Sequence, residues 1–163
     1  MPQTSKVGTM QTEELEYVGF WPRTGAAIID ALLLGFIVWP ILTIYYGESY
    51  WSADAPLIHG PLDFLLAWVF PAVATVLFWA VKQATPGKMA IAAKIVDAQT
   101  GQPASTGQLI GRYLGYYVSL IPLGLGIFWV AFDARKQGWH DKLAGTLVVR
   151  QKNRGPKPVV FGG

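Results

Sequence analysis

The segment TGAAIIDALLLGFIVWPILTIYY, residues Thr24 to Tyr46, decides the fold, because its 23 residues include a single charged side chain, Asp30. A helix of about 20 apolar residues is long enough to cross the hydrocarbon core of a bilayer. This segment therefore predicts a transmembrane helix. Residues 64–81 and 113–132, stretches of 18 and 20 residues, contain no charged side chain and are the other candidates for membrane insertion.

The composition of the whole chain excludes several classes of protein. Charged residues make up 14% of the 163 residues, against about 25% in ordinary soluble domains, and the mean hydropathy is +0.34. Such a chain is too apolar to be intrinsically disordered. The absence of cysteine excludes a disulfide framework or a thiolate zinc site. So few charges could hardly cover the surface of a soluble enzyme, which leaves an integral membrane protein.

The distribution of basic residues predicts the orientation of the first two spans. Residues 47–61 contain two acidic residues and no Lys or Arg, whereas residues 82–112 contain four basic residues. Lys6 and Arg23 precede the first span. Because loops rich in Lys and Arg stay in the cytoplasm, we expect a cytoplasmic N-terminus and a hairpin of two spans with an external loop.

The third apolar stretch conflicts with a single crossing. A single crossing would place the seven Lys and Arg residues that follow Phe132 outside the membrane. Pro122, Gly124 and Gly126 also interrupt the stretch, and both residue types weaken a continuous helix. We therefore predict two shorter helices, 106–121 and 125–135, that return the C-terminus to the cytoplasmic side. A plain third crossing is the alternative.

A small polar unit separates the second and third apolar stretches. Thr85-Pro86 has the pattern of a helix N-cap followed by proline at the first position. Residues 93–97 and 146–150 are β-prone and are predicted to pair with each other on the cytoplasmic side. The expected fold is an all-α membrane protein with two transmembrane helices, a broken or re-entrant third segment and this β pairing. We divide the chain into a cytoplasmic N-terminal segment 1–16, a membrane domain 17–150 and a flexible basic tail 151–163.

Asp30 is the most informative residue, because an ionised carboxylate inside a span costs about 3 kcal/mol on insertion scales. It is expected to face the interior of the helix bundle and to find a cation. Arg23 lies seven residues earlier, on nearly the same helix face but about 10 Å away along the axis. We therefore expect Arg112 to pair with Asp30, and Asp133 or Asp141 to pair with Arg23. A purely structural role for these charges and a functional one remain equally open.

The segment from Phe132 to Thr146 gathers two acids, several cations and turn-forming residues. Asp133, His140 and Asp141 could bind a metal or relay protons, but a chain with two histidines cannot build a multi-histidine metal site. A solvated network of ion pairs at the membrane face is the preferred interpretation. Neither a metal nor a cofactor is predicted. No nucleophile, base and orienting group converge, so the chain is not expected to be an enzyme.

Two series of small residues mark helix faces that allow close packing. Within-chain packing is preferred over dimerisation for both. The first series is Ala27, Ala31 and Gly35, and the second is Gly111, Gly115 and Ser119.

Several motifs together resemble the RDD family of membrane proteins over about residues 17 to 150. They are Gly19-Phe-Trp-Pro-Arg23 followed by Ile28-Ile-Asp30, Thr85-Pro-Gly-Lys88 leading to Lys94-Ile-Val-Asp97, and Trp139-His-Asp-Lys-Leu-Ala-Gly-Thr146. The family is named for one arginine and two aspartates, which the resemblance places at Arg23, Asp30 and Asp141. Asp133 and Asp97 are the alternatives for the last of these.

The resemblance implies a bacterial or archaeal inner-membrane protein that transports an ion or small solute. With the buried acid, it suggests proton coupling through Asp30, with Arg23 tuning that group. So few spans would require a homodimer or a partner subunit. The alternative is a non-transporting scaffold or regulatory subunit of a larger complex. The bilayer, with anionic lipid at the cytoplasmic face, is the expected partner, and the chain lacks the basic helix typical of nucleic-acid binding.

Overall fold

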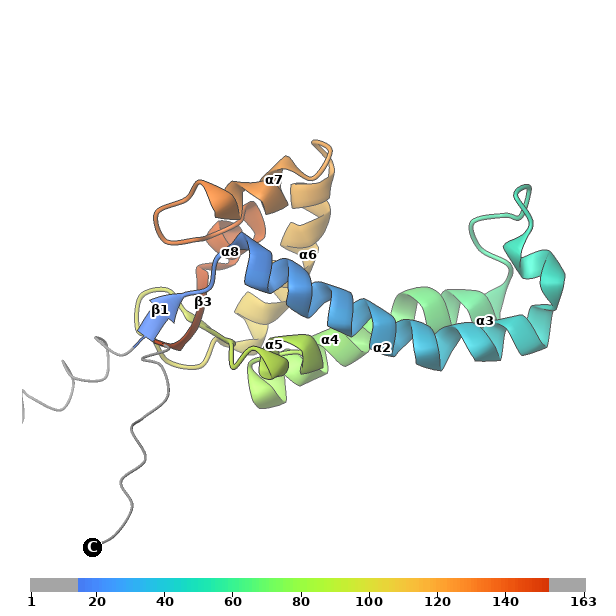
Figure 1. The fold of residues 1–163 in the computed structure, drawn as a ribbon, viewed down its shortest axis with the longest axis horizontal. Helices are drawn as coiled ribbons and strands as arrows, with labels where there is room; N and C mark the ends of the chain where they lie inside the picture. The colour runs from blue at the N-terminus through green and yellow to red at the C-terminus, as the bar shows by residue number, and fades with distance from the viewer. Residues whose placement is uncertain (1–14, 153–163) are drawn as a thin grey trace, which may run out of the picture.

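Two long apolar helices form a hairpin that extends to one side of the molecule in the computed structural model, which describes residues 15–152 (Figure 1). The first helix is α2 (Phe20–Tyr46), and the second runs through α3 (Pro61–Asp63), the π-helix η2 (Phe64–Val69) and α4 (Phe70–Lys82). Their 27 and 22 residues correspond to about 40 and 33 Å, enough to cross a bilayer. A short 3-10 helix, η1 (Glu48–Trp51), lies in the loop between them.

The side chains of this hairpin face outward. Only 17% of the 18-residue apolar stretch of α2, and 6% of the corresponding stretch of the second helix, is buried. Phe36 and Ile44 are 77% and 86% exposed. An apolar surface of this extent needs a covering other than water. The two predicted transmembrane helices are therefore confirmed as helices that contact the lipid bilayer.

The third apolar stretch is bent by 114° between α6 (Thr106–Leu120) and the pair formed by α7 (Leu125–Phe128) and the 3-10 helix η3 (Trp129–Ala131). The side chain of Ser105 and that of Gln108 cap the start of α6 reciprocally. At the bend Gly124 has a φ of +79°, a left-handed conformation that glycine adopts without strain. The predicted break is thus confirmed.

The expected end of the second short helix at Arg135 is wrong, because regular helix stops at Ala131. The carboxylate of Asp133 accepts hydrogen bonds from the backbone N–H groups of Arg135 and Gln137, both at 3.1 Å. Such side-chain-to-backbone bonds compete with the helical ladder. Residues 132–138 therefore form a loop that leads to α8 (Trp139–Ala144).

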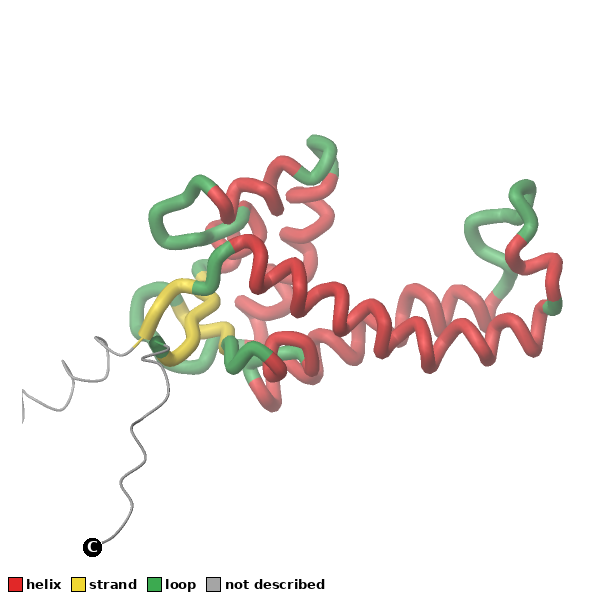
Figure 2. Tube along the Cα trace, in the orientation of Figure 1, coloured by secondary structure: helices red, strands yellow, loops and turns green. Residues whose placement is uncertain are grey.

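A three-stranded antiparallel sheet lies at the end of the hairpin where α2 begins and α4 ends (Figure 2). β2 (Lys94–Asp97) pairs with β3 (Thr146–Gln151), as predicted, with Ile95 opposite Val148. β1 (Leu15–Tyr17), which the sequence did not predict, pairs with the other edge of β3. The core of this end contains six fully buried side chains: Val18, Trp79, Ala93, Ile95, Leu109 and Val148.

The sheet fixes the path of the third apolar stretch. β1 precedes the first span, β2 follows the second, and β3 follows the bent segment, yet all three are hydrogen-bonded to one another. A sheet with open edges cannot be divided across a bilayer. The bent segment must therefore turn back, and the alternative of a third crossing is wrong. Figure 1 shows α6 running across the hairpin rather than along it. Most of the predicted N-terminal segment 1–16 and tail 151–163 lies outside the described residues.

Candidate functional site

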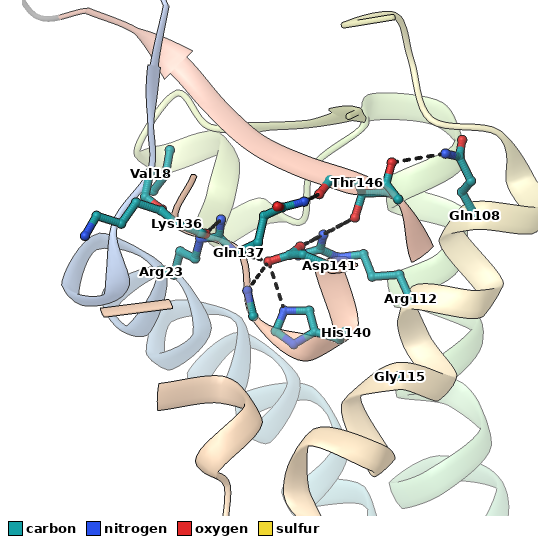
Figure 3. Close-up of polar contacts among 12 residues, drawn as sticks. Val18, Arg23, Gln108, Arg112, Gly115, Lys136, Gln137, His140, Asp141 and Thr146 are labelled. Carbon is teal, nitrogen blue, oxygen red and sulfur yellow. Dashed lines mark hydrogen bonds and ion pairs between the residues drawn. The ribbon is translucent and has the colours of Figure 1, made fainter. Parts of the chain in front are cut away.

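Asp141 is the centre of a buried cluster of charges (Figure 3). It lies in the first turn of α8, where one carboxylate oxygen accepts the N–H of Gly138 at 2.9 Å. The same oxygen, Oδ2, binds Nη1 of Arg23 at 2.6 Å, while Oδ1 binds Nη1 of Arg112. The side chains of Asp141 and Arg112 are completely buried. Asp141 therefore joins the first span to α6 through α8.

Arg23 uses all of its donor nitrogens within the fold. Besides the bond to Asp141, its Nε donates to the carbonyl of Val18 at 2.8 Å and its Nη2 to the carbonyl of Lys136 at 2.6 Å. One guanidinium thus ties the end of β1 and the loop before α8 to the first turn of α2. Its fork of donors suits this arrangement, which lysine could not reproduce.

Arg112 has hydrogen-bond partners for fewer of its donor nitrogens than Arg23. Its Nη1 also donates to Oγ1 of Thr146 at 2.8 Å, and its guanidinium carbon lies 5.3 Å from the ring centroid of Trp79 and 5.9 Å from that of Tyr116. The residues that the structure describes provide no hydrogen-bond partner for its Nε and Nη2. Burial alone would raise the pKa of Asp141, but the charges of Arg112 and Arg23 hold that pKa well below its usual range. The carboxylate is therefore ionised.

His140 lies beside this cluster as a neutral ring. It stacks on Tyr116 with 4.0 Å between ring centroids, and its backbone N–H donates to Oγ of Ser119 at 3.1 Å. Burial lowers the pKa of His140 to about 3, and Asp141 offsets only part of that effect. Asp133 lies apart, in an ion pair with Lys142 at 2.5 Å. In residues 15–152 no group of three acidic or histidine side chains suits a metal.

The predicted solvated ion-pair network is therefore wrong for Asp141 and His140, which are buried, and applies only to Asp133 with Lys142. The sequence could not distinguish these cases, because the apolar covering of Asp141 comes from helices remote in the chain. Its charge partners Arg23 and Arg112 lie 118 and 29 residues away in sequence.

The prediction that Asp30 pairs with Arg112 is also wrong. Asp30 instead accepts hydrogen bonds from Oγ1 of Thr85 at 2.5 Å and from the backbone N–H of Gly87 at 2.7 Å. These groups belong to the start of α5 (Pro86–Ala90), a short helix that packs on α2. The unpaired N–H groups at a helix start favour a carboxylate. Asp30 thus fixes α5 against the first span.

The close approach of α5 to α2 depends on Gly87. A Cβ atom at this position would lie 1.9 Å from the carbonyl oxygen of Ala26. Lys88, the next residue, thereby lies near the C-terminal end of α4, with its Nζ 5.9 Å from the ring centroid of Trp79. Lys88 is only 7% exposed, and burial lowers its pKa.

Two adjoining cavities, with volumes of about 620 and 510 Å³, lie between α2 and α6. The larger one also contacts α4 and includes Asp30 in its wall, whereas the smaller one contacts α7 and includes Arg23 and His140. We call the two together the α2–α6 cleft. Four residues line both cavities: Ala27, Lys88, Tyr116 and Leu120.

The small-residue face of α2 differs from the expectation, whereas that of α6 packs within the chain at two of its three residues. On α2 the buried face contains Ala26 and Gly35, while Ala27 and Ala31 are exposed and line the cleft. On α6, Gly115 and Ser119 pack within the chain against α8 and α7. A Cβ at Gly115 would lie 2.9 Å from the Cα of His140, whereas one at Gly111 would meet nothing within 4 Å.

A model of the RDD family matches residues 17–145 of this chain. The chain belongs to the RDD family. It is 32% identical over 146 residues to the uncharacterized protein YxaI of Bacillus subtilis, covering 80% of this chain and 95% of YxaI. It is 28% identical over 141 residues to the uncharacterized membrane protein YteJ of the same organism, covering 83% and 82% of the two chains.

A third relative of this RDD protein is the uncharacterized protein RP437 of Rickettsia prowazekii. The two are 41% identical over 75 residues, which are 46% of this chain and 41% of RP437. The match therefore spans about two fifths of the length of that relative. No solved structure matches this chain.

The RDD residues assigned from the resemblance occupy two sites of this protein. Arg23 and Asp141 are in direct contact, while Asp30 contacts Thr85 and Gly87. Among residues 15–152, the donors to Asp97, an alternative for the last aspartate, are its own turn and Gln108.

Sequence reasoning missed two groups of residues in this RDD protein. Lys88 was considered only as a loop charge and as part of the family motif, and it was not predicted to line a cavity. Asp63 is buried at the far end of the hairpin, where it accepts the hydroxyl of Tyr50 at 2.8 Å and the backbone N–H of His59 at 2.9 Å. Burial, together with this bond to Asp63, raises the pKa of Tyr50 to about 12.

Proposed function

We propose that this RDD protein transports an ion or small solute through the α2–α6 cleft, with proton coupling through Asp30. The observation that supports this proposal is the pair of ionisable side chains, Asp30 and Lys88, in the wall of one largely apolar cavity. Ionisable groups between membrane helices are costly and usually mark substrate or proton pathways.

The contacts of Asp30 suggest how its charge could act. The carboxylate binds Gly87 and Thr85 and so holds α5, which carries Lys88. Hydrogen bonds to an ionised acceptor are roughly twice as strong as neutral ones. Protonation of Asp30 would weaken both bonds and let Lys88 shift within the cleft. The charge on Asp30 and the position of Lys88 are therefore coupled in the proposed mechanism.

Two spans and one bent segment do not enclose a pathway across the bilayer. In our proposal a second copy of the chain or a partner subunit supplies the missing wall. The same proposal assigns the protein to the bacterial or archaeal inner membrane, with the sheet on the cytoplasmic side, where positively charged loops are retained.

Replacement of Asp30 by Asn is expected to abolish cation-driven proton movement. The purified protein is reconstituted into liposomes that contain a pH-sensitive dye, and a Na⁺ or K⁺ gradient is imposed. Wild-type protein should change the internal pH, and Asp30→Asn should reduce the initial rate at least tenfold, because the amide cannot carry the proton. Thr85→Val is the matched control, since it removes one hydrogen bond but keeps the carboxylate, and its rate should stay within about threefold of wild type. Equal rates for wild type and Asp30→Asn, or no flux with either, would contradict the proposal.

A second candidate function is a non-transporting scaffold or regulatory subunit. This function is favoured because every carboxylate oxygen of Asp30 and Asp141 already accepts a hydrogen bond from the protein itself. On this hypothesis, a stoichiometric partner should remain bound through purification in mild detergent, and no flux should be measured.

A further inference from the structure

Lys88 forms no direct ion pair with the described residues around the α2–α6 cleft. Residues 15–152 provide no hydrogen bond or ion pair for its Nζ, and the nearby carboxylate of Asp30 is engaged by Thr85 and Gly87. A buried charge without a partner is unfavourable. An anionic ligand at Lys88 would relieve this cost.

The charges around the cleft also favour an anion. Three cations, Arg23, Lys88 and Arg112, face two carboxylates, Asp30 and Asp141. His140 is neutral because burial lowers its pKa. Because Asp141 is shared between two arginines, that group of three carries one net positive charge close to the cleft.

The rest of the cleft suits a long apolar group. Leu33, Leu34 and Ile37 of α2 face Phe70 and Phe78 of α4 across the larger cavity. Several of these side chains are also partly exposed on the outer surface of the hairpin, which contacts lipid. The apolar wall of the cleft is therefore continuous with the lipid-facing surface of the hairpin.

The depth of Lys88 matches a lipid headgroup. α5 packs on α2 at Ala26 and Asp30, one to three turns from the start of the helix at Phe20. This level is near the end of the span that carries the sheet, where the headgroups of anionic lipids lie.

We propose that the α2–α6 cleft binds one anionic phospholipid, with its phosphate at Lys88 and an acyl chain along the larger cavity. The lipid would occupy the cleft that is also proposed as the transport pathway, but its binding is expected whether or not the protein moves a solute. It also differs from nonspecific attraction of the basic tail to the membrane, because it depends on a single buried lysine.

The test is a titration of the detergent-purified protein with phosphatidylglycerol while the midpoint of thermal unfolding is followed. Phosphatidylcholine with the same chains and soluble glycerol phosphate are the comparison ligands. Phosphatidylglycerol alone should raise the midpoint, because binding to the folded state stabilises it. The variant Lys88→Met keeps the apolar stem and should weaken the apparent affinity at least tenfold. Lys82→Met, which removes an exposed lysine at the end of α4, is the matched control and should leave the affinity within about twofold.

Four results would overturn the proposed site. They are an unchanged affinity of Lys88→Met, an equal loss in Lys82→Met, an equal midpoint shift with phosphatidylcholine, and an equal shift with glycerol phosphate alone. The last would identify a soluble phosphate site instead of a lipid site. Because the readout is binding and not flux, a failure of the transport proposal leaves this test unaffected.

Discussion

Replacement of Asp141 by Ala is expected to lower the free energy of unfolding by about 3–5 kcal/mol, the usual cost of breaking a buried ion pair by removing one partner. The change leaves Arg23 and the fully buried Arg112 without their shared carboxylate. It also removes the acceptor for the N–H of Gly138 at the start of α8. The loss is measured as the shift in thermal or denaturant unfolding of the detergent-purified protein.

The matched control for this change is Asp133→Ala. Asp133 forms an ion pair with Lys142, whose side chain is 45% exposed, and accepts two backbone N–H groups of its own loop, so the expected loss is about 1–2 kcal/mol. The stabilisation of the folded state by the ionised carboxylate of Asp141 should be fully present at neutral pH. Its pKa is held below the value of an unfolded aspartate, so the unfolded state takes up a proton first and the stabilisation disappears only on acidification. Equal losses for Asp141→Ala and Asp133→Ala would show that the buried cluster does not stabilise the fold.

Replacement of Gly87 by Ala is expected to cost about 3 kcal/mol, near the upper end for overpacking. The new Cβ would lie 1.9 Å from the carbonyl oxygen of Ala26 and 2.8 Å from its carbonyl carbon. Helix backbone cannot move aside, so α5 must withdraw and lose the 2.7 Å bond between Gly87 and Asp30. The unfolding midpoint measures this cost.

Gly25→Ala is the control for Gly87→Ala. Gly25 lies on the exposed face of α2, and a Cβ there would meet nothing within 4 Å. Alanine in a helix interior is more favourable than glycine by about 0.5–1 kcal/mol, so Gly25→Ala should leave the midpoint unchanged or raise it. If Gly87→Ala also left it unchanged, α5 would not pack on α2 as described.

The arrangement of the apolar segments could be predicted because it depends on local patterns. Length and absence of charge identify the two spans, and Pro122 with Gly124 marks the bend. The seven basic residues at the C-terminal end of the chain then require a return to the original side. The pairing of β2 with β3 follows from the same constraint.

The partners of Asp30 could not be predicted, because helical periodicity gives the face of a residue and not the element that covers it. The sequence showed that Asp30 needs a partner inside the bundle. It did not show that the start of α5 lies closer than Arg112. The buried face of α2 was misplaced by one residue, to Ala27 instead of Ala26, for the same reason, since contact with Gly87 decides which side is covered.

The central claim is that the bent third segment turns back, so that Asp141 lies between Arg23 and Arg112 on one side of the membrane. The natural chain has no cysteine, so single replacements can be labelled unambiguously with a membrane-impermeant maleimide in oriented vesicles. Ser52→Cys, Gln99→Cys and Lys152→Cys place the thiol at exposed positions in the hairpin loop, after β2 and after β3. Gln99→Cys and Lys152→Cys should react from the cytoplasmic side and Ser52→Cys from the opposite side. Labelling of Lys152→Cys from the same side as Ser52→Cys would contradict the account.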